Sequence, residues 1–261
     1  IGSFAGIIAF ALIYVGIDIV GLDFKWVYFV GGGVTIAIAL AAWTLFPVFP
    51  AKVEQNKHLV LRKRYWLYYA LVFMSGARRQ IFVVFAAFML VERFGFDAGT
   101  IALIFLANSA LSMVLAPRIG KLIGIWGERR ALTVEYLGLI VVFVAYAFVQ
   151  NPVIAIGLYI VDHVFFAMAI AMKTYFQKIA APADIAPTAG VSFTINHIAA
   201  VVLPAAFGVL WLVSPAAVFL AGAAMALASL GLSRLVPPNP DAGNEVISFG
   251  ATRPAPAQAA E

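Results

Sequence analysis

Residues 65–93 read YWLYYALVFMSGARRQIFVVFAAFMLVER, and this stretch decides which class of fold the chain can adopt. As a single helix it would be about 43 Å long, enough to cross roughly 30 Å of hydrocarbon with room to tilt. Arg78, Arg79 and Gln80 lie near its middle. An arginine at the centre of a bilayer costs at least about 2.5 kcal/mol, so it usually faces a protein interior or a watery cavity and has a partner. We therefore expect the rest of the chain to supply a partner for these two positive charges.

The composition of the chain points to the same class of protein. Of its 261 residues, 64% are hydrophobic and 11% are charged, whereas soluble domains average roughly 45–50% and about 25%. The apolar residues form long runs without the polar face that a soluble helix needs, which predicts an all-α integral membrane protein. The absence of cysteine excludes disulfides and thiolate metal sites from this chain. We expect no resident cofactor or metal, and the lipid bilayer as a partner.

Eight apolar runs, each of about 20 residues, predict eight transmembrane helices. Their approximate bounds are 4–20, 26–46, 65–93, 98–116, 131–149, 153–175, 189–213 and 216–235. The segments 47–64, 117–130 and 177–188 are expected to be loops, and 237–261, which is rich in Pro, Ala and Gly, a disordered tail. The chain begins at Ile1 and is apolar from its first residues, so we expect it to be a fragment that lacks preceding helices.

The basic residues are distributed unevenly between the loops. Alternating spans place most of the 17 lysines and arginines on one side, with Lys25 and Arg93 on the other and Arg78 and Arg79 within the membrane. Under the positive-inside rule the basic loops and both ends of the chain are cytoplasmic. This pattern indicates membrane orientation rather than a nucleic-acid partner, and we expect a bacterial inner (plasma) membrane.

The loop GKLIGIWGERR, residues 120–130, carries a recognisable motif. It resembles the cytoplasmic loop motif of the major facilitator superfamily, roughly G-x-x-x-D-R-x-G-R-R, at Gly120, Gly127, Arg129 and Arg130. Gly124 and Ile125 stand at the motif's acidic and basic positions, a departure common in its second, weaker copy, which lies between the eighth and ninth helices. The run PAAFG, residues 204–208, is similar to part of the family's eleventh helix.

The resemblance implies a register for the whole chain. Residues 1–46 would be the last two helices of the family's N-terminal half, 47–64 its central cytoplasmic loop, 65–236 the six-helix C-terminal half and 237–261 a cytoplasmic tail. The first four helices of the family would then be missing partners of this chain. Members of the family are not enzymes; they move small solutes by alternating access, with two halves rocking about a central site.

Two central groups of polar residues are the candidate site: Arg78, Arg79 and Gln80 with Tyr68 in residues 65–93, and Asp162 with His163 in residues 153–175. Arg79 shares a helical face with Tyr68, so we expect Arg79 more than Arg78 to face the cavity. It would bind an anionic group or belong to a charge pair that breaks during transport; a structural ion pair is the alternative. Asp162 is the expected partner of either arginine, and with His163 it could take up and release a proton.

Other polar residues at membrane depth are weaker candidates. Asn108 and Asn196 could bind solute, although ordinary interhelical hydrogen bonds explain most such residues. Glu135 is expected to pair with Arg129 or Arg130 at a cytoplasmic gate.

Three functions remain open from the sequence. The first is a secondary transporter of a small solute. Two central arginines favour an anionic, proton-coupled solute, although a salt-bridged gate would explain them equally well. The second is a membrane redox protein with haem on His163 and His197, and the third is a transporter-like receptor that moves nothing. No motif for nucleotide hydrolysis is present.

Overall fold

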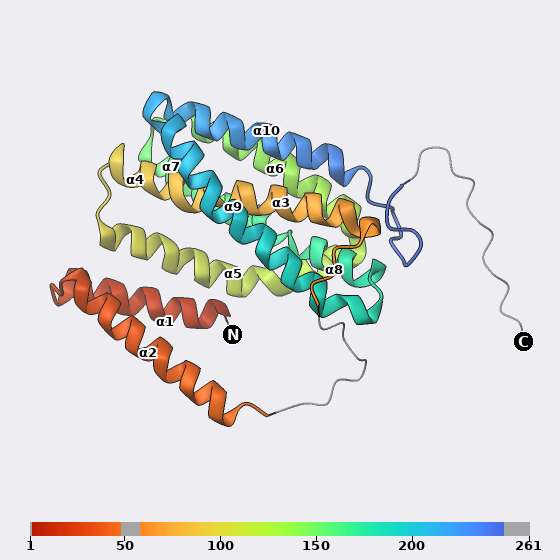
Figure 1. The fold of residues 1–261 in the computed structure, drawn as a ribbon. Coiled ribbons are helices and arrows are strands. Elements are labelled where there is room, and N and C mark those ends of the chain that lie inside the picture. The colour runs from red at the N-terminus through yellow and green to blue at the C-terminus, as the bar shows by residue number, and fades with distance from the viewer. Residues whose placement is uncertain (1, 48–57, 248–261) are drawn as a thin grey trace, which may run out of the picture.

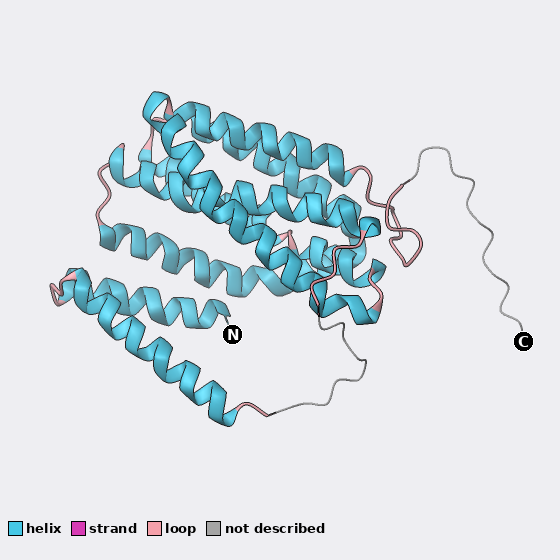
Figure 2. Cartoon of the chain, viewed as in Figure 1, coloured by secondary structure: helices cyan, strands magenta, loops and turns pink. Residues whose placement is uncertain are grey.

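The computed structural model describes residues 2–47 and 58–247, and within them the fold is all-α (Figures 1 and 2). The elements in chain order are α1 (Gly2–Tyr14), η1 (Val15–Ile19), α2 (Phe24–Leu45), η2 (Lys63–Tyr65), α3 (Trp66–Gln80), η3 (Ile81–Ala86), α4 (Ala87–Glu92), α5 (Ala98–Trp126), α6 (Glu128–Phe148), α7 (Pro152–Ala167), α8 (Ile170–Ile179), η4 (Pro182–Asp184), α9 (Ile185–Val213) and α10 (Pro215–Ser233).

These elements join into eight long apolar helical units. Seven of them are long and apolar enough to cross a membrane, the first of these being α2 and the last α10. The eighth, Gly6–Ile19, is apolar but shorter, and it ends in the wider π-helical turn η1. The predicted class, an all-α membrane protein with about eight spans, is therefore confirmed.

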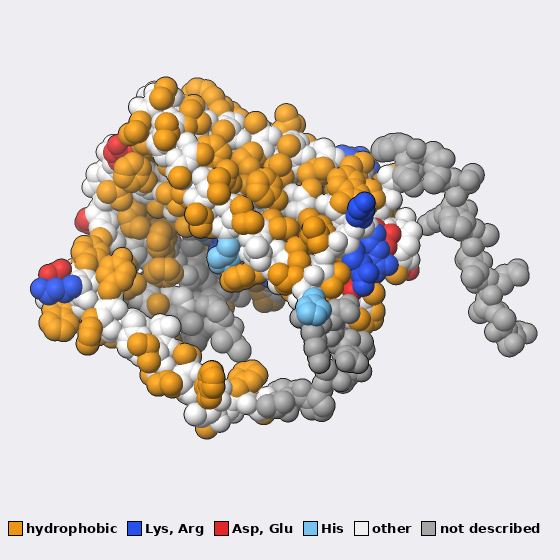
Figure 3. Space-filling model, viewed as in Figure 1, with side chains coloured by type: hydrophobic (Ala, Val, Ile, Leu, Met, Phe, Trp, Pro, Cys, Tyr) orange, Lys and Arg blue, Asp and Glu red, His pale blue; other side chains and the backbone are white. Residues whose placement is uncertain are grey.

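The core of the described chain lies among α3–α4, α6, α7, α8 and α10. In Figure 1, α10 and α6 lie along one side of this bundle, whereas α1 and α2 lie at the opposite side. Helix α1 packs on α5, and no residue of α2 is buried. Large apolar side chains cover the outer surface (Figure 3), as expected for helices that face lipid or further protein rather than water.

Glycines let three of the helices interlock. The ring of Phe143 on α6 lies directly over Gly222 on α10, where a Cβ would come within 2.5 Å of it. In the same way Phe165 on α7 occupies the space above Gly138 on α6. Small residues of this kind allow close packing, which is the main attraction between helices in a membrane. Helices α6, α7 and α10 thus form one tightly packed group.

The predicted loop 117–130 is wrong, because α5 continues through Pro117 as far as Trp126. A proline inside a helix removes one helical hydrogen bond, here the bond to the carbonyl of Met113, but prolines are tolerated within transmembrane helices. The side chain of Arg118 donates from Nη1 to the adjacent carbonyl oxygen of Val114, 3.1 Å away. The connection between α5 and α6 is therefore the single residue Gly127, whose φ of 78° favours glycine.

The predicted loop 177–188 is also shorter than expected. Helix α8 continues to Ile179 and α9 begins at Ile185, so that Pro187 lies in the first turn of α9. A proline is tolerated there, because the first amides of a helix have no intrahelical partner.

The first part of the predicted tail is packed rather than extended. Pro237 and Pro240 are buried, and the backbone N–H of Ile247 donates to the carbonyl of Leu235 at 2.9 Å. Tyr175 Oη donates to the carbonyl of Glu245 at 2.5 Å, which holds this segment against α8. Residues 248–261 of the predicted tail, and 48–57 of the predicted central loop, lie outside the described residues.

Candidate functional site

Arg78 is the largest side chain that is almost completely buried, with 1% of its surface exposed. Its Nε donates to the carbonyl of Met74 at 3.2 Å, and its guanidinium lies 4.6 Å from the centre of the Tyr136 ring. Nη1 and Nη2 have no hydrogen-bond partner within the described residues. A buried cation with spare donors needs a countercharge close by.

That countercharge is Glu135 on α6, which is fully buried. Its Oε1 lies 3.8 Å from Arg78 Nη2. The predicted pairing of Glu135 with Arg129 or Arg130 is therefore wrong. Helix α6 begins at Glu128, so Glu135 lies about 10 Å inside it. Neither arginine has the three-, four- or seven-residue spacing that would put it on the same face of the helix.

A small enclosed cavity adjoins this pair. It has a volume of about 80 Å³, and α3, α6 and α7 supply Arg78, Arg79, Leu139, Asp162, His163 and Phe166 to its lining. Asp162 is 4% exposed, and Arg78 acts electrostatically on both Asp162 and Glu135. Arg78 and Asp162 nevertheless form no ion pair within 4 Å in the described chain. Asp162, the predicted partner of the arginines, thus lines the cavity. The acid that contacts Arg78 is instead Glu135.

Arg79 and His163 lie at the more open side of the cavity. Arg79 is exposed, and its guanidinium lies 5.6 Å from the ring centre of Phe166. His163 Nδ1 is 2.9 Å from the carbonyl of Tyr159 and 3.7 Å from Asp162 Oδ2. The cavity therefore has a buried side with Arg78 and Asp162 and a more open side with the Arg79 guanidinium and the His163 imidazole, while Glu135 contacts Arg78 without lining the cavity.

The other predicted site residues lie elsewhere. Tyr68 Oη is 3.0 Å from Ser192 Oγ on α9, far towards the other end of α3, and Gln80 is half-buried without lining the cavity. Asn196 packs over Gly76, where it holds α9 close to α3. Asn108 on α5 is 5% exposed, and its amide has no hydrogen-bond partner within residues 2–47 and 58–247.

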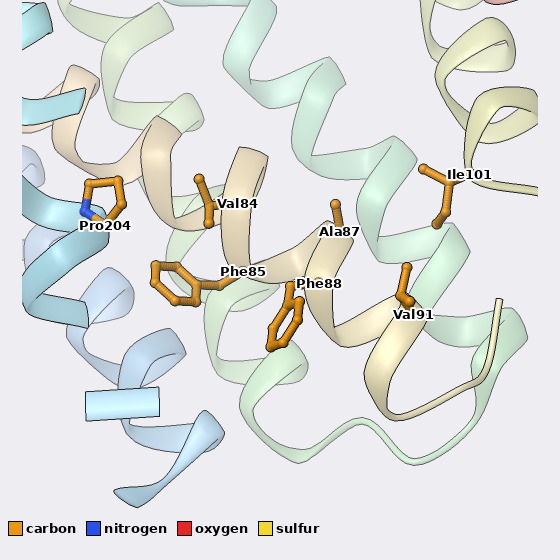
Figure 4. Close-up of a pocket in the computed structure, with 7 residues that line it drawn as sticks. All are labelled: Val84, Phe85, Ala87, Phe88, Val91, Ile101 and Pro204. Carbon is orange, nitrogen blue, oxygen red and sulfur yellow. The ribbon is translucent and has the colours of Figure 1, made fainter. Parts of the chain in front are cut away.

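A second, larger pocket is apolar and opens beside α4 (Figure 4). It has a volume of about 480 Å³ and is lined by Val84, Phe85, Ala87, Phe88, Val91, Ile101 and Pro204. In the close-up, Pro204 of α9 and Ile101 of α5 lie on either side of the residues from η3 and α4. Residues 84–91 follow Arg79 along the same helical unit, so this apolar surface lies beyond the charged cavity towards the far end of the helix.

The end of the bundle that carries Arg62, Arg64, Lys178 and Arg234 is here called the basic end, and Figure 3 shows its lysines and arginines gathered on one side of the molecule. Part of the motif in residues 120–130 lies at this basic end. Glu128 is 3% exposed, and its Oε1 is 2.6 Å from Lys178 Nζ on α8. Arg129 Nε is buried without a hydrogen-bond partner among the described residues, whereas Arg130 is exposed. Gly120 has open space around it.

A second ion pair at the basic end fixes the segment that leads into α3. Asp184 is 1% exposed; it accepts from Arg62 Nε at 2.5 Å and from Arg62 Nη2 at 2.9 Å. Tyr65 Oη donates to the same carboxylate at 3.1 Å. This hydrogen bonding, together with the negative charge, raises the pKa of Arg62 above its usual value. Bidentate bonding of this kind is the strong form of an ion pair.

Sequence reasoning missed three contributors to these clusters. Tyr136 directly follows Glu135, and a phenol near a buried cation is a signal that the sequence did contain. Glu128 lies inside the motif, between Gly127 and Arg129, but was not singled out. Asp184 was placed in a loop, where a carboxylate needs no partner.

The two histidines proposed as haem ligands each contact the backbone of their own helix. His163 does so at Tyr159, and His197 Nδ1 is 2.8 Å from the carbonyl of Phe193 on the exposed face of α9. Within the described residues, no group of three or more His, Cys, Asp or Glu could hold a metal ion.

Comparison with known proteins identifies the fold. The family model described as Major Facilitator Superfamily matches residues 1–204, which is well over half of the chain. No curated protein matches the chain. The matched region runs from α1 into α9 and contains both the charged cavity and the motif at the α5–α6 connection. The chain therefore belongs to the Major Facilitator Superfamily, a family of membrane transporters and not of enzymes.

Proposed function

We propose that the chain is part of a secondary active transporter that moves a small anionic solute together with a proton. The observation that carries this proposal is the charged cavity, in which Arg78 is buried against Glu135 while Arg79 stays exposed at the open side. One arginine is thus engaged within the protein, and the other is available to a solute.

Charge balance supports coupling to protons. Arg78 and Arg79 carry two positive charges, and Glu135 and Asp162 carry two negative charges when ionised. An anion bound at Arg79 would add one negative charge to a region with little water, which is costly. A proton taken up by Asp162, or by the adjacent His163, restores the balance. The pair Arg78–Glu135 then holds the helices in place while Asp162 changes protonation.

We also propose the orientation and register of the helices. The basic end is cytoplasmic by the positive-inside rule, in a bacterial inner membrane. The units α1–η1 and α2 would be the fifth and sixth helices of the family fold, and α3 to α10 its seventh to twelfth. The exposed side of Arg79 would then face helices supplied by the other half of the transporter.

Transport by the protein as the cell makes it, reconstituted in proteoliposomes, tests the function. The panel consists of radiolabelled acetate, lactate, succinate and inorganic phosphate, with glucose as the uncharged comparison, each with and without an inward proton gradient. We expect one class of anion to accumulate with the gradient. Arg79→Gln should raise its KM at least tenfold, and Asp162→Asn should abolish the response to the gradient.

The matched control is Arg93→Gln, which removes an exposed arginine at the far end of the same helical unit. It should transport like the parent protein. Unchanged transport in both Arg79→Gln and Asp162→Asn would assign the two residues to packing. Tight binding of an anion without flux in the parent protein would favour the receptor alternative.

A further inference from the structure

A groove between α6 and α10 opens at the basic end of the bundle. It has a volume of about 410 Å³ and is lined by Thr133, Leu137, Leu227, Leu230, Gly231 and Arg234. In Figure 1 these two helices lie on the side of the bundle away from α1 and α2. The groove therefore faces outward from the bundle and is separate from the charged cavity.

The walls of the groove are apolar and open. Leu137 is 50% exposed and Leu227 is 60% exposed. Gly231 contributes no side chain, and a Cβ built there would meet nothing within 4 Å. Because both helices are candidate membrane spans, a surface of this kind is covered by hydrocarbon rather than by water.

Two arginines lie where the groove reaches the basic end. Arg234 follows the last residue of α10 and lines the groove itself. Arg130 lies one turn before Thr133 on the same face of α6. Both are exposed, and neither forms an ion pair within residues 2–47 and 58–247, in contrast to Arg62 and Lys178. An apolar groove thus ends in two uncompensated positive charges.

We propose that this groove binds one anionic phospholipid. An acyl chain lies along Leu137, Leu227 and the open side of Gly231, and the headgroup phosphate lies between Arg130 and Arg234. An anionic phospholipid is the occupant that supplies both an apolar chain and a negative charge at the depth of a helix end. Basic pockets between transmembrane helices on the cytoplasmic side bind such headgroups in general. The proposal depends on the orientation given above but not on the identity of the solute.

Native mass spectrometry of the protein as the cell makes it tests this proposal. The protein is exchanged into detergent with equal amounts of dioleoyl phosphatidylglycerol and dioleoyl phosphatidylcholine, and the retained lipids are counted by mass. We expect one phosphatidylglycerol to be retained in preference to phosphatidylcholine. Arg130→Gln and Arg234→Gln should each weaken its retention about fivefold, while Arg234→Lys should keep most of it.

Two further variants separate the groove from general attraction to a basic surface. Gly231→Leu fills the groove without removing charge. It should therefore lower the retention of phosphatidylglycerol although both arginines are still present. The matched controls are Arg118→Gln, an exposed arginine eight residues before the end of α5, and Gly157→Leu, an exposed glycine on α7 that also has open space around it. Both should retain lipid like the parent protein. Thermal melts confirm that each variant is folded.

Three results would overturn the proposal. The first is equal retention of the two lipids by the parent protein. The second is the same loss in Arg118→Gln as in Arg234→Gln, which would indicate a diffuse charge effect. The third is a dimer that Gly231→Leu disrupts with no change in lipid, which would make the groove a contact between two copies of the chain.

Discussion

Arg78 and Arg79 are neighbours in sequence, but their surroundings are opposite. Arg78 is buried against Glu135, whereas Arg79 is exposed beside Phe166. The sequence predicted that two central arginines need acidic partners, because the cost of an unpaired charge in a membrane is large. It favoured Arg79 over Arg78 as the residue that faces the cavity, whereas both line it. It left open which arginine is paired with an acid, since consecutive residues differ by only 100° around a helix. Nor could it identify Glu135 as the partner, because that pairing depends on how α3 and α6 pack.

Removing the Glu135 charge should destabilise the protein. Glu135→Gln leaves Arg78 buried without a countercharge, and breaking a buried pair in this way costs about 3–5 kcal/mol. We expect a clearly lower melting temperature in detergent, measured by size-exclusion chromatography after heating. The double variant Arg78→Met/Glu135→Met should regain part of the loss, because no unpaired charge remains.

The control for this prediction is Glu92→Gln. Glu92 Oε2 accepts a hydrogen bond from Trp211 Nε1 at 2.9 Å, and a glutamine oxygen can accept the same bond. Its melting temperature should stay close to that of the parent protein. Equal melting temperatures for Glu135→Gln and Glu92→Gln would show that Glu135 does not balance Arg78.

Asp97 gives a pH dependence that can be predicted in sign. It precedes α5 and accepts a hydrogen bond from the backbone N–H of Thr100 at 2.7 Å, which lowers the pKa of its carboxyl. A lowered folded-state pKa means that the stabilisation is fully present above the unfolded value, about 4, and is lost as the pH falls through the folded value. Asp97→Ala should therefore lower the melting temperature at pH 7, and by less and less as the pH falls below about 4. A difference that persists undiminished at pH 3 would contradict this assignment.

At the level of elements, the apolar runs predicted the existence of every helix, but not where some of them end. Pro117 and the basic residues after it were interpreted as a loop, yet α5 continues for nine residues beyond that proline. An apolar composition identifies only the part of a helix that lies in the hydrocarbon layer. Helix α5 has 29 residues, and its last turns extend beyond that layer, where polar residues are common. The glycine contacts between α6, α7 and α10 could not be predicted either, because each depends on which helix lies opposite.

Helix α10 offers a matched pair of glycines for testing this packing. Gly222→Val places a side chain where the Phe143 ring lies, so α6 and α10 must separate. We expect a loss of about 1–3 kcal/mol, as for other overpacked cores, seen as a lower melting temperature. Gly231→Val, on the same helix but with open space around it, should have little effect. The prediction fails if the two variants melt at the same temperature.

For the whole molecule, hydropathy and a short motif were enough to predict the family, and the family model over residues 1–204 confirms it. The number and order of helices follow from the thickness of a bilayer, which makes them visible in a single sequence. The position of the predicted tail residues 237–247 was harder to foresee, because Tyr175 and Ile247 hold them through contacts to distant parts of the chain.

The proposed orientation can be tested with single cysteines, since this chain has none. Lys25 and Asn239 are both exposed, at opposite ends of the bundle. In intact cells a membrane-impermeant maleimide should label Lys25→Cys and not Asn239→Cys, whereas permeabilised cells should show both. The parent protein sets the background of the assay. The reversed pattern of labelling would place the basic end outside.

The one-residue connection at Gly127 has a consequence for biosynthesis. Helix α5 ends at Trp126 and α6 begins at Glu128, so the connection is too short for the two helices to move apart. With so short a connection, we expect α5 and α6 to insert into the bilayer together, leaving the translocon as one helical hairpin. In the orientation proposed here, the closed end of that hairpin stays on the ribosome side, where the arginines that flank it never have to cross the lipid.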